Sequence, residues 1–286
     1  MPNVKKQTAK VKRKPEAKKK VTGIEAKLKD MEFCEGIKIC IYGRSGTGKT
    51  SLWGSFPGPI ACIQCSGGSK PGELRTLNTP EMRKKIKTFV LEETSEIRDL
   101  VELQEETGRF KTIVIDHATG LQDTTLAEVL DLDEIPAQNS WGLASQQDYG
   151  QCSLQMKTNL RMLLGLACNV VIIAQEREFT PSEDDGMIMP HVAAALSPSV
   201  AGWLNPACDY VVETFIRQKT IVKKVKVGGK TTEVRKPTKG VEYCLRTGPH
   251  AVYTTKFRIP KGSGELPDVI VDPDYMKILK LIEGGQ

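Results

Sequence analysis

A glycine-rich segment that follows an apolar stretch near residue 40 constrains this chain more than any other part of its sequence. Residues 37–42 are mostly apolar, and residues 50–53, which follow the segment, are compatible with a helix. The segment consists of Gly43, Arg44, Ser45, Gly46, Thr47, Gly48, Lys49, Thr50 and Ser51. This is the pattern G-x-x-x-x-G-K-[ST], in which glycines let successive backbone N–H groups point at phosphate oxygens. The sequence therefore predicts a strand, a phosphate-binding loop and a helix, in that order.

The side chains of this segment predict a bound nucleoside triphosphate and a magnesium ion. Lys49 has the position that reaches the β- and γ-phosphates, and the Thr50 hydroxyl has the position of a Mg²⁺ ligand. The helix that follows offers its N-terminal N–H groups to the anion. Asp116 ends a β-branched stretch at residues 112–116, where a carboxylate holds the Mg²⁺ shell. The alternative for Asp116 is a helix N-cap or an aspartate in a turn.

Composition indicates a chain without a membrane span. Of its 286 residues, 39% are hydrophobic and 27% are charged. The longest apolar stretch, residues 162–174, contains Asn169 and is too short to cross a bilayer. The N-terminus is rich in lysine with no apolar segment behind it, so we expect no secretory signal and a cytoplasmic protein. Cys62 and Cys65 form a lone C-x-x-C pair without histidines at ligand spacing, so we expect no metal site there.

The positive charge belongs to one end of the chain. The net charge is +6, but residues 1–30 hold eleven Lys and Arg residues against Glu16, Glu25 and Asp30. The rest of the chain therefore carries a small negative charge. We predict a disordered basic arm at residues 1–30, suited to nucleic-acid phosphates, and one domain at residues 31–286. The alternative for the arm is a solubilising tail.

Apolar strands alternate with helices through the first two thirds of the chain, which predicts an α/β fold with a mainly parallel sheet. We expect strands at residues 60–64, 88–91, 112–116 and 170–175, and helices at 94–107 and 150–167. Beyond Asp209 we expect an antiparallel extension of the same sheet, with its strands at residues 210–216, 221–227, 231–235, 241–246 and 251–258. Gly228 and Gly229 are typical of a hairpin turn. A short amphipathic helix is expected at 274–283.

The order of these motifs is similar to that of a known group of proteins. A P-loop is followed by the strand that ends in Asp116, by a strand that ends in Gln175, and by a later Lys-x-Arg strand at Lys256 and Arg258. Over about residues 36–260 the chain resembles phage nucleotide-binding proteins of RecA-like fold. These include Sak-type single-strand-annealing ATPases, which are related to the RecA and RadA recombinases.

The resemblance implies ATP with Mg²⁺, hydrolysis to ADP and phosphate, and a homo-oligomer in DNA recombination or single-strand annealing. It also implies binding of single-stranded DNA without sequence specificity, with a single-strand-binding protein as a further partner. A phage-encoded chain would act in the host cytoplasm.

The resemblance also implies roles for individual residues. Gln175 is similar to the glutamine that senses the γ-phosphate and couples it to a DNA-binding loop, and residues 176–199 match that loop in position. Residues 131–149, with Trp141 and Tyr149, match a second DNA-proximal loop. Lys256 and Arg258 resemble cations that reach a neighbouring subunit's γ-phosphate. The alternatives are a strand-capping amide for Gln175 and an exposed basic strand for the two cations.

The chain departs from this family in two ways. Ser66 stands where a water-activating glutamate is usual, and Glu73 is the nearest glutamate after it. Loss of a general base lowers a rate by a factor of about 10² or more. The presumed DNA loops are acidic, with Asp131, Asp133 and Glu134 in one and Glu183, Asp184 and Asp185 in the other. These departures leave open a nucleotide-gated, self-assembling protein with little or no hydrolysis. A P-loop kinase fits less well, because the loops offer no arginine-rich lid.

A second basic stretch lies within the predicted domain. Residues 217–239 hold nine Lys and Arg residues against Glu233 alone, mostly on the predicted hairpin. A basic β-ribbon tracks nucleic-acid phosphates without reading sequence. The alternative is a charged edge strand that resists aggregation.

Overall fold

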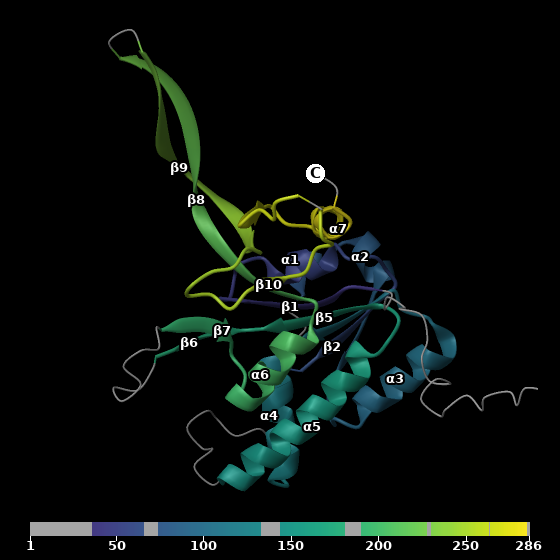
Figure 1. Ribbon diagram of the computed structural model, residues 1–286. Coiled ribbons are helices and arrows are strands. Elements are labelled where there is room, and N and C mark those ends of the chain that lie inside the picture. The colour runs from purple at the N-terminus through teal and green to yellow at the C-terminus, as the bar shows by residue number, and fades with distance from the viewer. Residues whose placement is uncertain are drawn as a thin grey trace, which may run out of the picture. The chain divides into compact units, whose positions relative to one another are not determined.

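The computed structural model describes residues 36–65, 74–132, 144–180, 190–227, 230–262 and 264–284 (Figure 1). For residues 222–227 and 230–235 only the backbone is described. These segments belong to one compact unit, which spans residues 35–286. The predicted basic arm at residues 1–30 lies outside the described residues. None of the helices in the described segments is long and apolar enough to cross a bilayer.

A mainly parallel sheet forms the centre of this unit. Its strand order is β11-β9-β8-β1-β5-β4-β2-β3, and the strands from β8 to β3 are parallel. The parallel strands are β1 (Lys38–Gly43), β2 (Ile60–Gln64), β3 (Ile86–Val90), β4 (Thr112–Asp116), β5 (Asn169–Ala174) and β8 (Tyr210–Val227). Every residue of β1 and β5 is buried. Continuous apolar strands are what a sheet covered on both faces requires.

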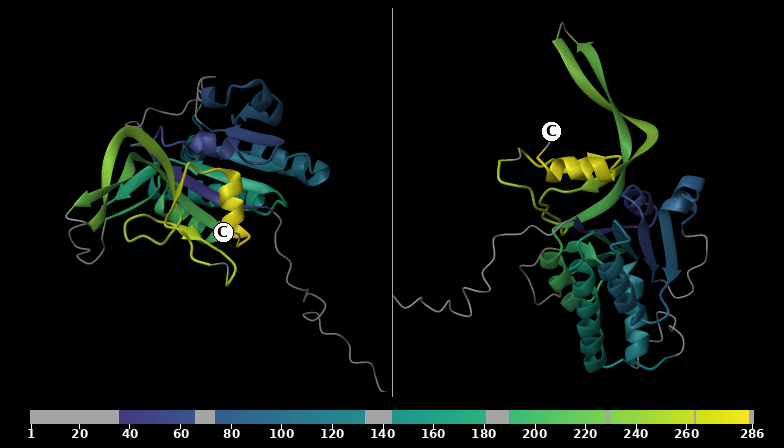
Figure 2. Two further views of the ribbon diagram at one scale, coloured as in Figure 1. Left: turned by 90° about the horizontal axis from the view of Figure 1, so that it is seen from above. Right: turned by 90° about the vertical axis from the view of Figure 1, so that its right-hand side faces the viewer.

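Helices cover the two faces of the sheet in separate layers (Figures 1 and 2). One layer holds α1 (Lys49–Gly54), α2 (Pro80–Lys85) and α7 (Tyr275–Ile282), with a 3₁₀ turn at Arg75–Leu77. The other holds α3 (Glu96–Thr107), α4 (Ala118–Val129), α5 (Gln146–Leu164) and α6 (Pro198–Ala207). Side chains of β1 alternate between the layers, because Ile39 and Ile41 belong to the apolar cluster that includes α1, whereas Cys40 and Tyr42 belong to the cluster that includes α5.

A long hairpin extends the sheet beyond the parallel strands. β8 pairs with β1 only through its first five residues, and β9 (Lys230–Arg246) pairs antiparallel with β8 from Glu213 onward. β11 (Val269–Val271) and β10 (Lys256–Phe257) are short additions to β9 and β8. β6 (Glu176–Phe179) and β7 (His191–Ala194) form a separate two-stranded sheet.

The structure confirms the α/β class, the mainly parallel sheet and its antiparallel extension, and it corrects details of that extension. The strand that begins at Tyr210 is parallel to β1, so the antiparallel part begins only at β9. The strands expected at 231–235 and 241–246 are one strand, because a bulge at Gln218/Thr220 carries the pairing past Pro237. Of the strand expected at 251–258, only a bridge at Tyr253 and the two residues of β10 form.

Asn169 fixes the amino-terminal edge of the sheet. Its Oδ1 accepts the Ile37 N–H at 2.8 Å, and its Nδ2 donates to the Lys111 carbonyl at 3.1 Å. The Asn169 side chain is buried, so bulk water cannot replace it as the hydrogen-bond partner of these backbone groups. The polar residue within the apolar stretch therefore joins the starts of β1, β4 and β5.

Replacement of Asn169 by alanine is expected to destabilise the fold. The change leaves the buried Ile37 N–H without its acceptor, at a cost of about 1–3 kcal/mol, while the Lys111 carbonyl still accepts the backbone N–H of residue 169. Urea unfolding followed by circular dichroism measures this loss, with Gln151→Ala on the exposed face of α5 as the control. Equal stability of the two variants would show that Asn169 is dispensable.

Candidate functional site: the phosphate-binding pocket

The loop after β1 has the backbone conformation that its glycines predict. Gly46 and Gly48 adopt φ angles of 83° and 92°, in the left-handed region that favours glycine. Gly48 is the N-cap of α1, so the N-terminal N–H groups of this helix face the space above the loop. The loop thus presents backbone donors at the carboxyl edge of the sheet.

Lys49 lies within this loop with its ammonium group largely removed from water. Its Nζ donates to the Gly43 carbonyl at 2.6 Å and to the Arg44 carbonyl at 2.7 Å. Burial lowers the pKa of Lys49, and the nearby Asp116 carboxylate acts in the opposite direction. A cation held so close to curled backbone amides is suited to an anion with several oxygens.

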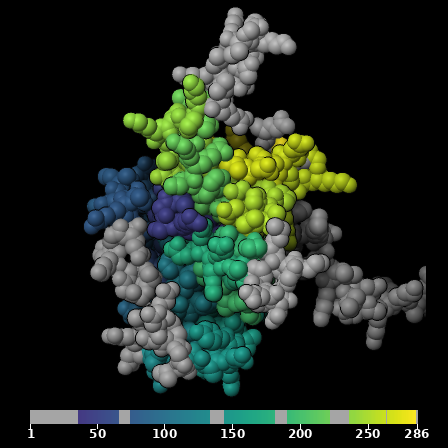
Figure 3. Space-filling model, turned by 90° about the vertical axis from the view of Figure 1, so that its left-hand side faces the viewer, coloured from purple at the N-terminus to yellow at the C-terminus, as the bar shows by residue number. Residues whose placement is uncertain are grey.

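A pocket of about 610 Å³ opens above the loop, where β1, β4 and β5 end. It is lined by Ser45, Gly46, Thr47, Gly48, Lys49, Thr50, Ser51, Leu52, Thr76, Asp116, His117, Gln175, Tyr243, Asp272 and Pro273. Figure 3 shows the purple segment of the chain, which contains this loop, at the surface beside the green strands β8 and β9. The structure thus brings Lys49, Thr50, Asp116 and Gln175 to one cavity, which is the arrangement predicted from the sequence.

The pocket offers oxygen ligands for a divalent cation. Asp116 ends β4, and its Oδ2 accepts a hydrogen bond from Trp53 Nε1 at 3.2 Å. The Thr50 side chain, in the first turn of α1, lines the same pocket. One hydroxyl and one carboxylate, completed by phosphate oxygens and water, form the kind of donor set that Mg²⁺ takes. The residues present therefore fit a Mg²⁺–triphosphate complex.

Gln175 and His117 lie at the wall of the pocket that faces β6 and β7. The Gln175 N–H donates to Thr119 Oγ1 at 3.4 Å, and its carbonyl accepts the Ala195 N–H at 2.8 Å. Gln175 is one of the residues that line the pocket. His117 caps α4, because its Nδ1 accepts the Gly120 N–H at 2.9 Å. Thus His117, and not Asp116, is the N-cap of that helix.

Tyr243 and Asp272 are pocket residues that the sequence analysis did not single out. The Tyr243 ring lies 3.1 Å from the point where a Cβ on Gly48 would stand, so a larger residue there would press on the ring. Asp272 has a φ of 48°, and its N–H donates to the Tyr243 carbonyl at 2.7 Å. Lys277 Nζ in turn donates to the Asp272 carbonyl at 2.7 Å. No local pattern marks these residues, because strand pairing between β9 and β11 brings them over the loop.

The family model described as an AAA domain matches residues 35–259. The chain belongs to the AAA domain family. Together with the P-loop and the strand order, this match makes the chain a RecA-like P-loop NTPase in fold. No curated protein matches the chain.

Two solved structures show a distant likeness to this chain. The flagellar accessory protein FlaH from Methanocaldococcus jannaschii is 10% identical, with 83% of this chain and 87% of that chain covered and a TM-score of 0.39. A KaiC-like protein from Pyrococcus horikoshii OT3 is 14% identical, with 73% and 85% covered and a TM-score of 0.36.

Lys256 and Arg258 lie away from the pocket of their own chain. Lys256 pairs with Val211 and so lies toward the amino end of β8, whereas the P-loop follows the carboxyl end of β1. The Lys256 ammonium donates to the carbonyls of Asn205 and Pro206, both at 3.0 Å, and to that of Cys208. Arg258 pairs with Asp209 at 3.1 Å. The predicted contact with a neighbouring subunit's γ-phosphate stays a prediction.

Several predicted residues fall outside the described part of the chain. These are Ser66, Glu73, Asp133, Glu134, Trp141, Glu183, Asp184 and Asp185. The two presumed DNA loops are more regular at their ends than expected. Tyr149 lies in the first turn of α5, and residues 176–179 and 191–194 are the strands β6 and β7.

Lys256→Ala is expected to lower the free energy of unfolding by about 1–3 kcal/mol. The ammonium group satisfies carbonyls at the end of α6, and loss of hydrogen bonds to a charged group costs about that much. Thermal and urea unfolding measure the change, with Lys261→Ala as an exposed control. Unchanged stability together with loss of ATP hydrolysis would instead point to the intersubunit role.

Proposed function

We propose that this protein is a Mg²⁺-ATP-binding ATPase that binds single-stranded DNA without sequence specificity, in phage-type recombination or single-strand annealing. The convergence of Lys49, Thr50, Asp116 and Gln175 on one pocket supports the nucleotide part. The choice of ATP, the DNA and the homo-oligomer come from the resemblance to phage RecA-like proteins. A single-strand-binding protein is a further proposed partner.

In this proposal each pocket residue has one task. The backbone N–H groups of the P-loop and the Lys49 ammonium bind and orient the phosphates. Thr50 and Asp116 would hold Mg²⁺, which would neutralise charge on the phosphate oxygens. Gln175 hydrogen-bonds the γ-phosphate or the attacking water. The Tyr243 ring, which lies against the loop at Gly48, supplies an apolar surface for the rest of the nucleotide.

The β8–β9 hairpin supports the proposed DNA contact. Its sequence is strongly basic over residues 217–239, and Lys219, Lys236 and Lys239 are exposed. Ile216, Val241 and Tyr243 are also exposed at its base, by 50%, 55% and 44%. A ribbon with cations along it and apolar groups near its root suits the phosphates and base faces of a single strand. The charged-edge alternative predicts no DNA binding by this ribbon.

A contact between the P-loop and β6 offers a route from nucleotide to DNA. Arg44 in the P-loop pairs with Glu176 at 2.6 Å, and Glu176 begins β6. Gln175 lies next to Glu176 and lines the pocket. The ion pair is exposed on the arginine side, so its energy is small and it is easily rearranged. A γ-phosphate that engages Gln175 and the loop would therefore act on the β6–β7 sheet.

The carboxylates of the pocket favour a second candidate. Among the described residues that line it, only Asp116 and Asp272 are acidic, and neither is a glutamate placed to activate water. A nucleotide-gated self-assembling protein with little or no hydrolysis matches this lining. The ATPase rate with and without single-stranded DNA separates the two candidates. Stimulation by DNA supports the first, and nucleotide-dependent oligomers without turnover support the second.

Lys49→Ala is expected to weaken binding of ATP by about 10- to 100-fold, because charge-assisted hydrogen bonds to phosphate are worth about 1.5–3 kcal/mol. Titration of a fluorescent ATP analogue in Mg²⁺ measures the affinity, and addition of EDTA tests the metal. Lys87→Ala is the control, because Lys87 is exposed on the edge strand β3. Equal affinities of Lys49→Ala and the wild type would refute the proposed nucleotide site.

Charge reversal on the hairpin is expected to weaken DNA binding. A variant with Lys219→Glu, Lys236→Glu and Lys239→Glu removes three phosphate contacts, so both the affinity and its dependence on salt should fall. Fluorescence anisotropy with a labelled oligonucleotide measures both. The matched control carries Lys84→Glu, Lys87→Glu and Lys261→Glu, three exposed lysines elsewhere. If the two variants bind equally, the hairpin is not the DNA surface.

A further inference from the structure

The exposed side of α3 and the turn before it form an acidic track that the nucleotide site does not use. The track consists of Glu92, Glu93, Asp99, Glu102, Glu105 and Glu106, all exposed. Among the described residues, no salt bridge involves any of these carboxylates. Arg98 is the one cation of the helix. The repulsion between neighbouring carboxylates is therefore left largely uncompensated within the described chain.

The end of α3 adds to this electrostatic cost. Glu105 and Glu106 lie in the last turn, where the helix dipole is negative, and that turn has no basic residue. The helix ends at Gly108, which adopts a left-handed conformation. A cation bound along this end would relieve two unfavourable interactions together: repulsion between the carboxylates, and their repulsion by the dipole.

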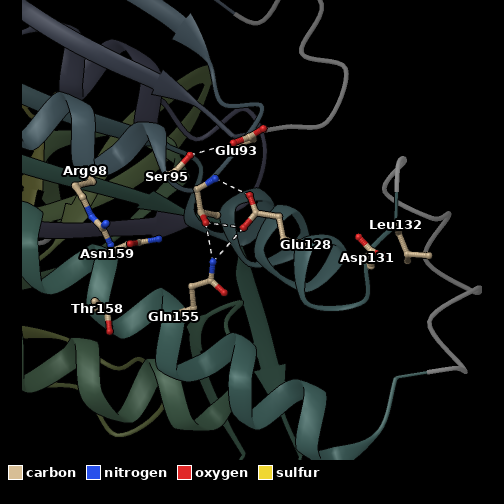
Figure 4. Close-up of a pocket in the computed structure, with 10 residues that line it drawn as sticks. Glu93, Ser95, Arg98, Glu128, Asp131, Leu132, Gln155, Thr158 and Asn159 are labelled. Atoms are coloured by element: carbon tan, nitrogen blue, oxygen red, sulfur yellow. Dashed lines mark hydrogen bonds between the residues drawn. The ribbon is translucent and has the colours of Figure 1, made fainter.

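A cavity of about 630 Å³ continues the track at the other end of the helix, between α3, α4 and α5 (Figure 4). Its lining includes Glu93, Ser95, Arg98, Asp131, Gln155 and Asn159. Ser95, Arg98, Glu102 and Glu105 follow helical spacing, so they form one stripe from this cavity to the last turn of α3. The track and the cavity are thus one surface.

One buried group in the cavity has no partner among the residues that the structure describes. Asn159 is only 7% exposed, and its Nδ2 makes no hydrogen bond to any of them. In Figure 4 its amide points into the space between Arg98 and Gln155. The carboxylate of the neighbouring Glu128 already accepts two hydrogen bonds, from the Thr94 N–H at 2.6 Å and from Gln155 Nε2 at 3.1 Å. An orphaned buried donor is rare, and it is satisfied when a ligand brings an acceptor.

These observations define the chemistry of an occupant. Carboxylates in a row require several positive charges, and the track extends over the 12 residues of α3, or about 18 Å. The Asn159 amide requires an acceptor such as a backbone carbonyl. A polyamine has the charges but no acceptor, and nucleic acid has acceptors but the wrong charge. An extended lysine-rich polypeptide supplies both.

We propose that this surface docks the lysine-rich segment, residues 1–30, of a second copy of the protein. That segment carries eleven Lys and Arg residues and a net charge of +8. The segment is long enough to follow all of α3, since extended chain spans about 3.4 Å per residue. The choice of a second copy rests on the homo-oligomer of the proposed function. Docked in this way, the segment links subunits and is withheld from nucleic-acid phosphates.

Zero-length carbodiimide cross-linking of the full chain tests this inference. Equal amounts of ¹⁴N and ¹⁵N protein are mixed at low salt, cross-linked and analysed by mass spectrometry. We expect mixed-isotope links between lysines of residues 1–30 and the track carboxylates, together with Asp131. The links should disappear in high salt, because exposed charges are screened.

Two variants sharpen the test. Glu102→Lys, Glu105→Lys and Glu106→Lys together should abolish the links to the track, while α3 stays folded because cations favour its last turn. The control with Glu81→Lys, Glu178→Lys and Glu265→Lys has the same change in charge on exposed residues elsewhere. Asn159→Ala should reduce links to Glu93 and Asp131 by about threefold or more, the worth of one hydrogen bond.

Three outcomes would overturn the inference: links spread evenly over all surface carboxylates, links confined to single chains, or links equally frequent in the track variant and its control. The same samples are titrated with the fluorescent ATP analogue. Intact nucleotide binding in a protein without the expected links would remove the docking inference and leave the proposed nucleotide site standing.

Discussion

The structure depends on the buried strand β1, which places the Lys49 ammonium group at the carboxyl edge of the sheet. β1 pairs with β5 on one side and with β8 on the other, so its position is fixed along its whole length. Gly43 ends it with so little room that an added Cβ would stand 2.3 Å from the Thr214 carbonyl oxygen. Thr47 and Thr214 then join loop and strand through their hydroxyls at 2.7 Å. The Lys49 ammonium is held by carbonyls of this same loop, so the position of this cation depends on the packing of the strand.

The parts of the fold that could be predicted from sequence are the strands whose own apolar residues show that both of their faces are buried. Residues 60–64 and 112–116 are continuous apolar runs because both faces of a parallel strand are buried, and they form β2 and β4 with the expected bounds. The P-loop residues and Asp116 follow such strands, so their place in the pocket was predictable. The amphipathic helix at the end of the chain, α7, was predictable from its spacing.

Long-range pairing explains what sequence could not provide. β8 and β9 continue as a two-stranded ribbon beyond the helical layers. Their outer residues therefore lack a regular alternation of apolar and polar side chains, and the sequence predicts each long strand as two shorter ones. Tyr243 and Asp272 reach the pocket through the pairing of β9 with β11. Lys256 has the sequence context of a free basic strand, yet three carbonyls at the end of α6 surround its ammonium group. None of these contacts has a local signature.

The root of the hairpin is tied to the pocket by a buried ion pair. Arg246 donates to Glu213 at 2.7 Å, and the guanidinium lies over the rings of Phe215 and Tyr253. Burial raises the pKa of Glu213, and Arg246 opposes that shift, so a change that parts the pair leaves a buried carboxylate uncompensated. Thr214, beside Glu213, contacts the P-loop through Thr47. The ribbon is therefore held in one position relative to the nucleotide pocket.

Nucleotide binding and hydrolysis make different demands on this pocket. In the proposed function, binding requires the loop amides, Lys49 and the oxygens of Thr50 and Asp116, whereas hydrolysis also requires a base for water. A ligand that binds one arrangement of Arg44, Gln175 and the β6–β7 sheet more tightly than another shifts the protein toward it, whether or not the ligand is then cleaved. The differential affinity limits the size of that shift. Hydrolysis would add only a way to reverse this shift. A weak ATPase with this pocket would therefore still change between two arrangements when nucleotide binds.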